Sequence, residues 1–381
     1  MNKIYLDNNA TTKVDKQVVD EMNKFYLEEY GNPSSMHEMG EKAREAIDKA
    51  RAEIAQELGC KSWEIIFTSG TTESNNLSFF GLARSKLGER KKKIIVSAIE
   101  HSSIFELCDA LKKEGFDIVE IGVDNNGLIN FEELKNKIDD KTLLVSIMHV
   151  NNEIGIIQDI EKIGKICGEK KVLFHSDCAQ SFGKLNINVK DMNIDLLSAG
   201  AHKISGPKGI GILYLREGIE IAPLIYGSQE KGLRGGTENV PGIVGIAKAL
   251  QIAKKIDKEK IEKIRDYLIN ELEKIGKING SKEQRIYDNV NVSFPGIDGE
   301  ELVLLLSSKG IFVSIGSACD SKKKKESKVL REIGLNKDEI MSSIRIGIGK
   351  DIEKKDADML LKEIKKLISF KRRFIKNLQA K

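Results

Sequence analysis

An acid and a lysine follow two neighbouring apolar stretches, at a spacing that could hold a flat cationic ring. Val172-Leu173-Phe174-His175 is short and β-prone, which predicts a buried parallel strand ending near Asp177. Leu196-Leu197-Ser198-Ala199 predicts the next strand, with Lys203 in the turn after it. A buried acid is costly unless it meets a cation. Pyridoxal phosphate needs such an acid at its ring nitrogen and a lysine amine for its imine link.

Two turns are rich in groups that bind anions. Ser69-Gly70-Thr71-Thr72-Glu73 combines a predicted strand end, a glycine and hydroxyls at a helix start. The run 201–209, which contains His202 and Lys208, offers further donors and flexible glycines. The first turn could equally be an ordinary capped helix start, and the second a solvated loop.

Three further side chains could do chemistry. His101 follows a predicted strand and could stack on a flat ring, or act only as a structural hydrogen-bonding group. Cys319 stands in a stretch of small residues followed by lysines, which favours a nucleophilic thiolate over an incidental surface cysteine. Arg345, in an otherwise apolar strand pattern, either pairs structurally or clamps a carboxylate.

The composition excludes several classes of function. The net charge is only +4, from 62 basic and 58 acidic residues, so the chain lacks the overall excess of positive charge that is typical of nucleic-acid-binding proteins. No apolar run approaches the roughly 18 residues of a membrane helix, and the first residues lack the apolar core of a secretory signal. The 5 scattered cysteines show no zinc-site spacing and indicate reduced thiols. We therefore expect a cytoplasmic protein that does not contact membranes or nucleic acid directly.

Strand and helix patterns alternate through the first two thirds of the 381 residues. The apolar strands predict a parallel sheet covered on both faces, with 210–215 as an antiparallel edge strand. We expect Ser34 or Ser35 to cap a helix that Gly59 ends, and Ser102 to cap another. A long helical pattern follows at 238–275. The last segment predicts a smaller α+β region, with strands near 290–294, 311–313 and 344–346 and helices at 299–309 and 353–378.

Eight motifs stand in an order that resembles one enzyme family. They are 5–12, 31–35, 69–73, 149–155, 177–180, His202-Lys203, 234–237 and 316–319. Together they are similar to the cysteine desulfurases of the class V aminotransferases, of pyridoxal-phosphate fold type I. The resemblance implies an α/β fold with a mainly parallel seven-stranded sheet. It places a large cofactor-binding domain at 16–250, and a smaller α+β domain at 1–15 with 251–381 that carries the cysteine loop.

The resemblance also implies residue roles. Lys203 would carry pyridoxal 5'-phosphate covalently, His101 would stack on its ring, and Cys319 would take the sulfur. The other cofactor-binding residues that it implies are Asp177, Gln180, Asn152, Thr71, Thr72, His202, Gly200 and, from a second subunit, Thr237. The substrate L-cysteine would meet Arg345, Asn32 and Asn152.

The chain departs from the family pattern at Lys231, where arginine is frequent, in the basic run Lys322–Lys325, and above all at one further position. Gly200 stands two residues before His202, where the family usually has serine. A phosphate hydroxyl is then missing, and Ser198 or a water could substitute for it.

The implied reaction converts L-cysteine to L-alanine and leaves a persulfide on Cys319. The long cysteine loop resembles the group I branch, which feeds iron–sulfur cluster assembly and tRNA thiolation through acceptor proteins. A homodimer is expected, and a transient role for Cys319 as an iron–sulfur ligand stays open. The alternatives are a selenocysteine lyase, another fold type I enzyme such as an aminotransferase, or a non-enzymatic partner protein.

Overall fold

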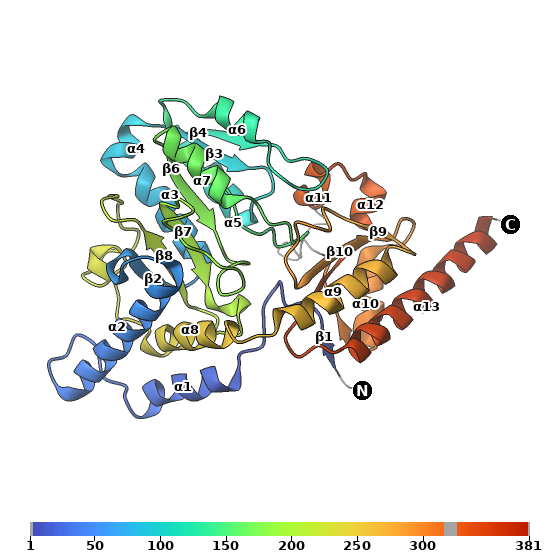
Figure 1. Ribbon diagram of the computed structural model, residues 1–381, viewed down its shortest axis with the longest axis horizontal. Coiled ribbons are helices and arrows are strands. Elements are labelled where there is room, and N and C mark those ends of the chain that lie inside the picture. Colours follow the sequence, from blue (N-terminus) through green and yellow to red (C-terminus); the bar gives the residue numbers. More distant parts are fainter. Residues whose placement is uncertain (1–2, 316–325, 380–381) are drawn as a thin grey trace.

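The computed structural model describes residues 3–315 and 326–379, and its largest layer is a seven-stranded sheet (Figure 1). The strand order is β2-β8-β7-β6-β5-β3-β4, and the five strands from β7 to β4 run parallel. The strands are β2 (Ile65–Thr68), β3 (Lys93–Ser97), β4 (Asp117–Ile121), β5 (Thr142–Ser146), β6 (Leu173–Asp177), β7 (Leu196–Gly200) and β8 (Gly211–Leu215). The predicted α/β fold with a mainly parallel sheet is confirmed.

The strand expected at the sheet edge lies inside it. β8 is antiparallel to both of its neighbours, β2 and β7, and all five of its residues are buried. The edge prediction for 210–215 was therefore wrong. An apolar run shows that a strand is buried but not which strands flank it, and β2 comes from far earlier in the chain.

Helices cover both faces of the sheet (Figure 1). Ile65 and Phe67 point into one apolar cluster, whereas Ile66 between them points into another, as the two-residue period of a strand requires. The first cluster holds side chains of α1 (Lys16–Leu27), α2 (Glu38–Leu58), α6 (Phe131–Lys137), α7 (Ile160–Glu169) and α8 (Val240–Ala253). The second holds those of α3 (Thr71–Ala83) and α5 (Ser102–Lys113), and the short α4 (Lys86–Arg90) follows α3.

Two helices begin with a histidine cap. The side chain of His37 accepts a hydrogen bond at the start of α2, and His101 does the same for α5. The predictions of Ser34, Ser35 and Ser102 as caps were therefore wrong, because an imidazole nitrogen can accept the same backbone N–H. The predicted end of α2 is confirmed: Gly59 has φ 69°, a left-handed conformation that favours glycine.

The long helix expected over 238–275 is two helices. α8 ends at Ala253, and α9 (Lys258–Leu272) begins after Asp257, whose side chain accepts from the Lys260 N–H. The apolar period runs across the break, which is why the sequence pattern did not show it. In Figure 1 this link joins the sheet layer to the C-terminal region.

The C-terminal region is the expected smaller α+β unit. β12-β10-β9 form an antiparallel sheet, and β1 pairs in parallel with β11. Ile4 and Leu6 share one apolar cluster with residues from 261 to 368, but the exact domain limits stay a prediction. The remaining elements are β1 (Ile4–Tyr5), β9 (Lys277–Ile278), β10 (Asn289–Ser293), β11 (Ile311–Phe312), β12 (Ser343–Gly347), α10 (Gly299–Ser308), α11 (Lys328–Glu332), α12 (Lys337–Met341) and α13 (Lys354–Gln379).

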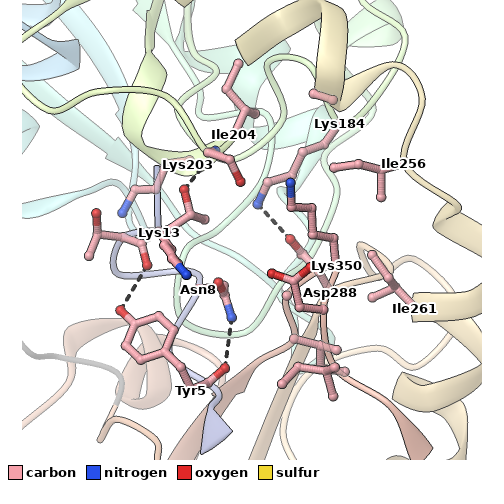
Figure 2. Close-up of a pocket in the computed structure, with 18 of the residues that line it drawn as sticks. Tyr5, Asn8, Lys13, Lys184, Lys203, Ile204, Ile256, Ile261, Asp288 and Lys350 are labelled. Atoms are coloured by element: carbon pink, nitrogen blue, oxygen red, sulfur yellow. Dashed lines mark hydrogen bonds and ion pairs between the residues drawn. The ribbon is translucent and has the colours of Figure 1, made fainter. Parts of the chain in front are cut away.

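A buried ion pair joins the sheet layer to the C-terminal unit (Figure 2). The Nζ of Lys184 lies 2.7 Å from the Oδ2 of Asp288, and both side chains are only 6% exposed. The other Asp288 oxygen accepts from the Asn9 side chain. Each charge therefore depends on its partner, because water reaches neither of them freely.

A second buried carboxyl lies beneath the ends of β3 and β5. Glu100 is 3% exposed, and its Oε1 accepts a 2.8 Å hydrogen bond from the Met148 N–H. Burial raises the pKa of Glu100 to about 8. At neutral pH the side chain is therefore protonated and uncharged.

Replacing Asp288 with Ala should destabilise the protein by about 3–5 kcal/mol, because the Lys184 ammonium is left buried without its partner. The shift in thermal unfolding midpoint measures this. Lys16→Ala is the matched control: Lys16 pairs with Asp20 but is 90% exposed, and its loss should cost less than about 1 kcal/mol. Equal shifts for the two variants would contradict the structural role of the buried pair.

Glu100→Gln should gain stability relative to the unchanged protein as the pH rises from about 4.5 to about 8. In that window the folded protein holds a proton on Glu100 that the unfolded chain has lost, so its stability falls with rising pH. The amide that replaces the carboxyl cannot ionise, and the difference should reach the order of 4 kcal/mol. Thermal midpoints at pH 5 and pH 8.5 measure it, with Glu106→Gln, an exposed glutamate of α5, as control. A pH-independent difference would contradict the buried, protonated state.

Candidate active site

One cavity of about 600 Å³ collects most of the predicted site residues. It lies at the carboxyl ends of β6 and β7, where α3 also begins. In parallel α/β sheets this edge is the usual place for a ligand. The predicted residues that line the cavity are Thr71, Thr72, His101, Asn152, Asp177, Gln180, His202, Lys203 and Arg345.

Asp177 is the last residue of β6 and is 3% exposed. Its Oδ2 accepts from the Asn75 side chain at 2.9 Å, and its Oδ1 accepts from the Ala179 N–H at 2.9 Å. These two donors hold the carboxylate in one orientation. Asn75 was not predicted as a site residue, because it lies one helical turn beyond Thr71 among other polar residues at the start of α3, and nothing in the sequence distinguishes it from them.

Lys203 ends the short 3₁₀ turn (Ala201–Lys203) that follows β7. Its Nζ donates to the backbone carbonyls of Asn9 at 2.7 Å and Ala10 at 2.6 Å. Lys203 also lines a second cavity, of about 510 Å³, between the sheet layer and the C-terminal unit (Figure 2). Its side chain therefore lies in a wall that the two cavities share.

The two histidines of the site are neutral at pH 7. Burial, together with the nearby Lys203 ammonium, lowers the pKa of His202 to about 4. Burial also lowers the pKa of His101, with Asp177 opposing the shift and Lys203 adding to it. The Nδ1 of His101 accepts from the Ser103 N–H, and the Nδ1 of His202 lies 3.2 Å from the Thr11 hydroxyl. Both rings can thus bind a ligand without adding charge.

The start of α3 forms a cradle for an anion. Gly70 precedes the helix without a side-chain cap, so the first N–H groups are not capped by a side chain. Two buried oxygens of the cavity residues, Thr71 Oγ1 and Gln180 Oε1, have no hydrogen-bond partner among the described residues. The Nε2 of Gln180 donates to the Asn9 carbonyl, so only its oxygen is left for a ligand. Buried polar atoms normally find partners, and these two therefore mark a ligand site.

Arg345 lies in β12 and is 2% exposed. One guanidinium nitrogen lies 2.8 Å from the Asp7 Oδ1, and another donates to the Asn152 carbonyl at 3.0 Å. Arg345 therefore forms a structural ion pair and also presents a cation to the cavity, so the geometry fits both of the roles expected from the sequence. Asp7 was likewise not predicted as a site residue, because an aspartate beside Asn8 and Asn9 is already accounted for by a turn.

Three described residues among those predicted do not line this cavity: Gly200, Asn32 and Thr237. Asn32 lies in the loop between α1 and α2, where its Oδ1 accepts from the Ser34 N–H. Thr237 lines a different hollow. Cys319 lies outside the described residues.

The other four cysteines are poor nucleophiles. Each is a free thiol, and burial raises its pKa to about 12. A protonated thiol does not attack at neutral pH. The cysteines are Cys60, Cys108, Cys167 and Cys178.

Two kinds of feature are absent from the described part of the chain. No helix there combines the length and apolar character needed to cross a bilayer. No group of three or more His, Cys, Asp or Glu side chains there is arranged to hold a metal ion.

Comparison with known proteins places this fold and cavity in a family. Residues 4–360 match the family described as aminotransferase class-V. A cysteine desulfurase IscS of Methanosarcina thermophila is 44% identical over 371 residues, which cover 96% of this chain and 92% of that relative. A cysteine desulfurase IscS of Rickettsia prowazekii is 45% identical over 365 residues, covering 93% and 88%.

Solved structures agree with the sequence matches. A NifS-like protein superposes with a TM-score of 0.91 at 40% identity, covering 97% of this chain and 100% of that one. The structure titled SspA in complex with cysteine gives a TM-score of 0.83 at 40% identity, covering 91% and 99%. With nearly the whole chain matched, the protein belongs to the aminotransferase class-V family and, within it, to the cysteine desulfurases.

Proposed function

We propose that the protein converts L-cysteine to L-alanine and transfers the sulfur to Cys319 as a persulfide. The observation that carries this proposal is the single cavity that brings together the Lys203 amine, the Asp177 carboxylate, the His101 ring and the Arg345 cation. Relatives named as cysteine desulfurases support it, as does the structure whose title includes cysteine.

The donor set fits pyridoxal 5'-phosphate. Lys203 would hold it covalently, Asp177 would pair with its ring nitrogen, and His101 would stack on the ring. The unpartnered Thr71 and Gln180 oxygens match the polar groups that such a ligand carries. When bound, this group withdraws electrons from the carbon next to the substrate amine. Thr72 and His202 would complete the phosphate site with Thr71.

The chain's own residues then perform the remaining tasks. Asp177, held by two N–H donors, would keep a proton on the ring nitrogen. Lys203 would take the proton from the substrate's Cα. His101, whose pKa is lowered by burial, would handle the proton on the thiol of the substrate or of Cys319. Because Asp177 is buried, water screens its electrostatic interactions only weakly.

Arg345 would bind the substrate carboxylate, with Asn152 beside it. The guanidinium already touches Asp7, so an incoming carboxylate meets a cation that is oriented in advance. Asp7 and the substrate would share the arginine or compete for it. An uncharged ligand would leave the ion pair undisturbed.

In the sulfur step, the Cys319 thiolate attacks the substrate sulfur. An S–S bond forms and the substrate's C–S bond breaks, while the carbon fragment keeps the bonding electrons and leaves, once protonated, as L-alanine. The other four cysteines are protonated at pH 7, which supports Cys319 for this role. The persulfide would pass to an acceptor in the cytoplasm, an iron–sulfur scaffold or a tRNA-thiolation enzyme.

A second copy of the chain would complete the site. Asn32 and Thr237 do not line the cavity of their own chain, yet the family resemblance gives both a role there. Several large apolar side chains near them are exposed, which favours burial against another molecule. They are Tyr26, Leu27, Tyr30, Met36, Ile225 and Tyr226.

Cys319→Ser should keep the visible absorbance band of the bound cofactor, while sulfide release from L-cysteine falls about a thousandfold or more. The reason is that the variant lacks the sulfur acceptor but keeps every cofactor contact. Cys60→Ser is the control and should keep full turnover. Normal turnover in Cys319→Ser would contradict the proposed nucleophile.

Parallel assays with L-cysteine and L-selenocysteine distinguish the rivals. A clear preference for selenocysteine would favour a lyase for that substrate. Purified protein that stays colourless with added pyridoxal phosphate would favour a non-enzymatic partner protein.

In solution the protein should have a mass near twice 42.5 kDa by light scattering, because the exposed apolar side chains would be covered by a second copy. Tyr226→Asp should halve that mass and weaken cofactor binding, since Thr237 of the second chain is then lost. Leu304→Asp, an equally apolar exposed position on α10, should stay dimeric. A monomeric unchanged protein with full cofactor binding would contradict the shared site.

A further inference from the structure

The backbone conformation at Gly200, the last residue of β7, does not require a glycine. Its φ of −145° and ψ of 155° are ordinary extended values that any residue adopts. A Cβ built here would lie 2.8 Å from the Thr71 Oγ1, which is closer than real Cβ contacts. The next atoms, the Thr71 backbone N and the His202 Cδ2, are 3.6 Å and 3.8 Å away, which is ordinary contact. Of these three atoms, only the Thr71 hydroxyl would have to shift to admit a Cβ at residue 200.

The Thr71 hydroxyl is itself in an unusual state. It is buried, it has no hydrogen-bond partner among the described residues, and its residue lines the main cavity at the start of α3. A buried hydroxyl without a partner is costly, so its position favours a ligand that accepts its proton. The open N–H groups beside it indicate an anionic acceptor.

Ser198, the other hydroxyl considered for this role, is already engaged. It is fully buried, and its Oγ lies 2.9 Å from the Nε2 of His175. Burial lowers the pKa of His175 to about 3, so that ring stays neutral and keeps the contact. Ser198 is also not among the residues that line the cavity, and the suggestion that it substitutes for a missing serine was wrong.

We propose that Thr71 supplies, from the first turn of α3, the phosphate hydroxyl that a serine at position 200 would otherwise supply from the end of β7. This inference rests on the proposed function, since the phosphate is that of the pyridoxal cofactor. Residues 71 and 200 form a reciprocal pair: the space between them holds one hydroxyl-bearing side chain. Gly200 is then the partner that makes room for Thr71, and no hydroxyl is missing from the site.

Equilibrium binding of pyridoxal phosphate to the cofactor-free protein tests the pair, in five forms: unchanged, Thr71→Val, Thr71→Ser, Gly200→Ser and Thr71→Ala/Gly200→Ser. Thr71→Val keeps the shape and removes the hydroxyl, and its Kd should rise about tenfold. Thr71→Ser keeps the hydroxyl and should bind nearly as the unchanged protein. Gly200→Ser should also weaken binding, because it crowds Thr71. The double variant should recover to within about threefold of the unchanged Kd.

Pyridoxal without phosphate is the matched probe. Its affinity should stay the same in Thr71→Val, because the hydroxyl contacts only the phosphate, and inorganic phosphate should compete less well in that variant. Circular dichroism of each cofactor-free variant controls for folding. Equal Kd values for Thr71→Val and the unchanged protein would overturn the reciprocal pair. So would a double variant whose affinity for pyridoxal phosphate is lower than that of Gly200→Ser alone. An unchanged protein that binds no pyridoxal phosphate would instead overturn the proposed function, and this inference with it.

Discussion

A charged carboxylate at the end of a strand inside an apolar sheet is the constraint on which the site depends. Asp177 is nearly inaccessible to solvent, and charge is tolerated there only when donors and cations face it. Asn75 and the Ala179 N–H are those donors. Because β6 and β7 run parallel, their carboxyl ends lie at one edge, which brings Lys203 to the same cavity. α3 serves twice: Asn75 orients the acid, and Thr71 begins the anion cradle.

Neutral groups dominate the rest of the site. The two histidines at the cavity are uncharged at pH 7, and Glu100 beneath it is protonated. The charged residues that line the cavity are Glu73, Asp177, Lys203, Lys208 and Arg345, and Arg345 is paired with Asp7. A zwitterionic amino acid therefore meets both cations and carboxylates in this cavity, and water screens the charges of Asp177 and Arg345 least because these two are the most buried.

The α/β fold class could be predicted from the sequence, because the buried strands of a parallel sheet appear as short apolar runs that alternate with helical patterns. The sequence also predicted Asp177, Lys203 and His101 as candidates because they lie at or after strand ends, whereas the roles of most other cavity residues came from the family resemblance. The prediction failed where the answer depends on partners far away in the chain. The position of β8 depends on β2, the break before α9 lies inside a continuous apolar period, and a histidine at a helix start gives no clear capping signal. Asp7 and Asn75 were missed because ordinary turn and helix roles already accounted for them.

The pairing of β1 with β11 has a consequence for how the chain is made. Residues 4–5 find their strand partners only at 311–312, and Asp7 finds Arg345 still later. A ribosome that has finished the sheet layer has therefore not yet produced the segment against which Ile4 and Leu6 pack. Closing so long a loop is entropically slow. The segment that carries the Asn9 and Ala10 carbonyls, which hold Lys203, is therefore anchored on its N-terminal side by residues made about 300 positions later.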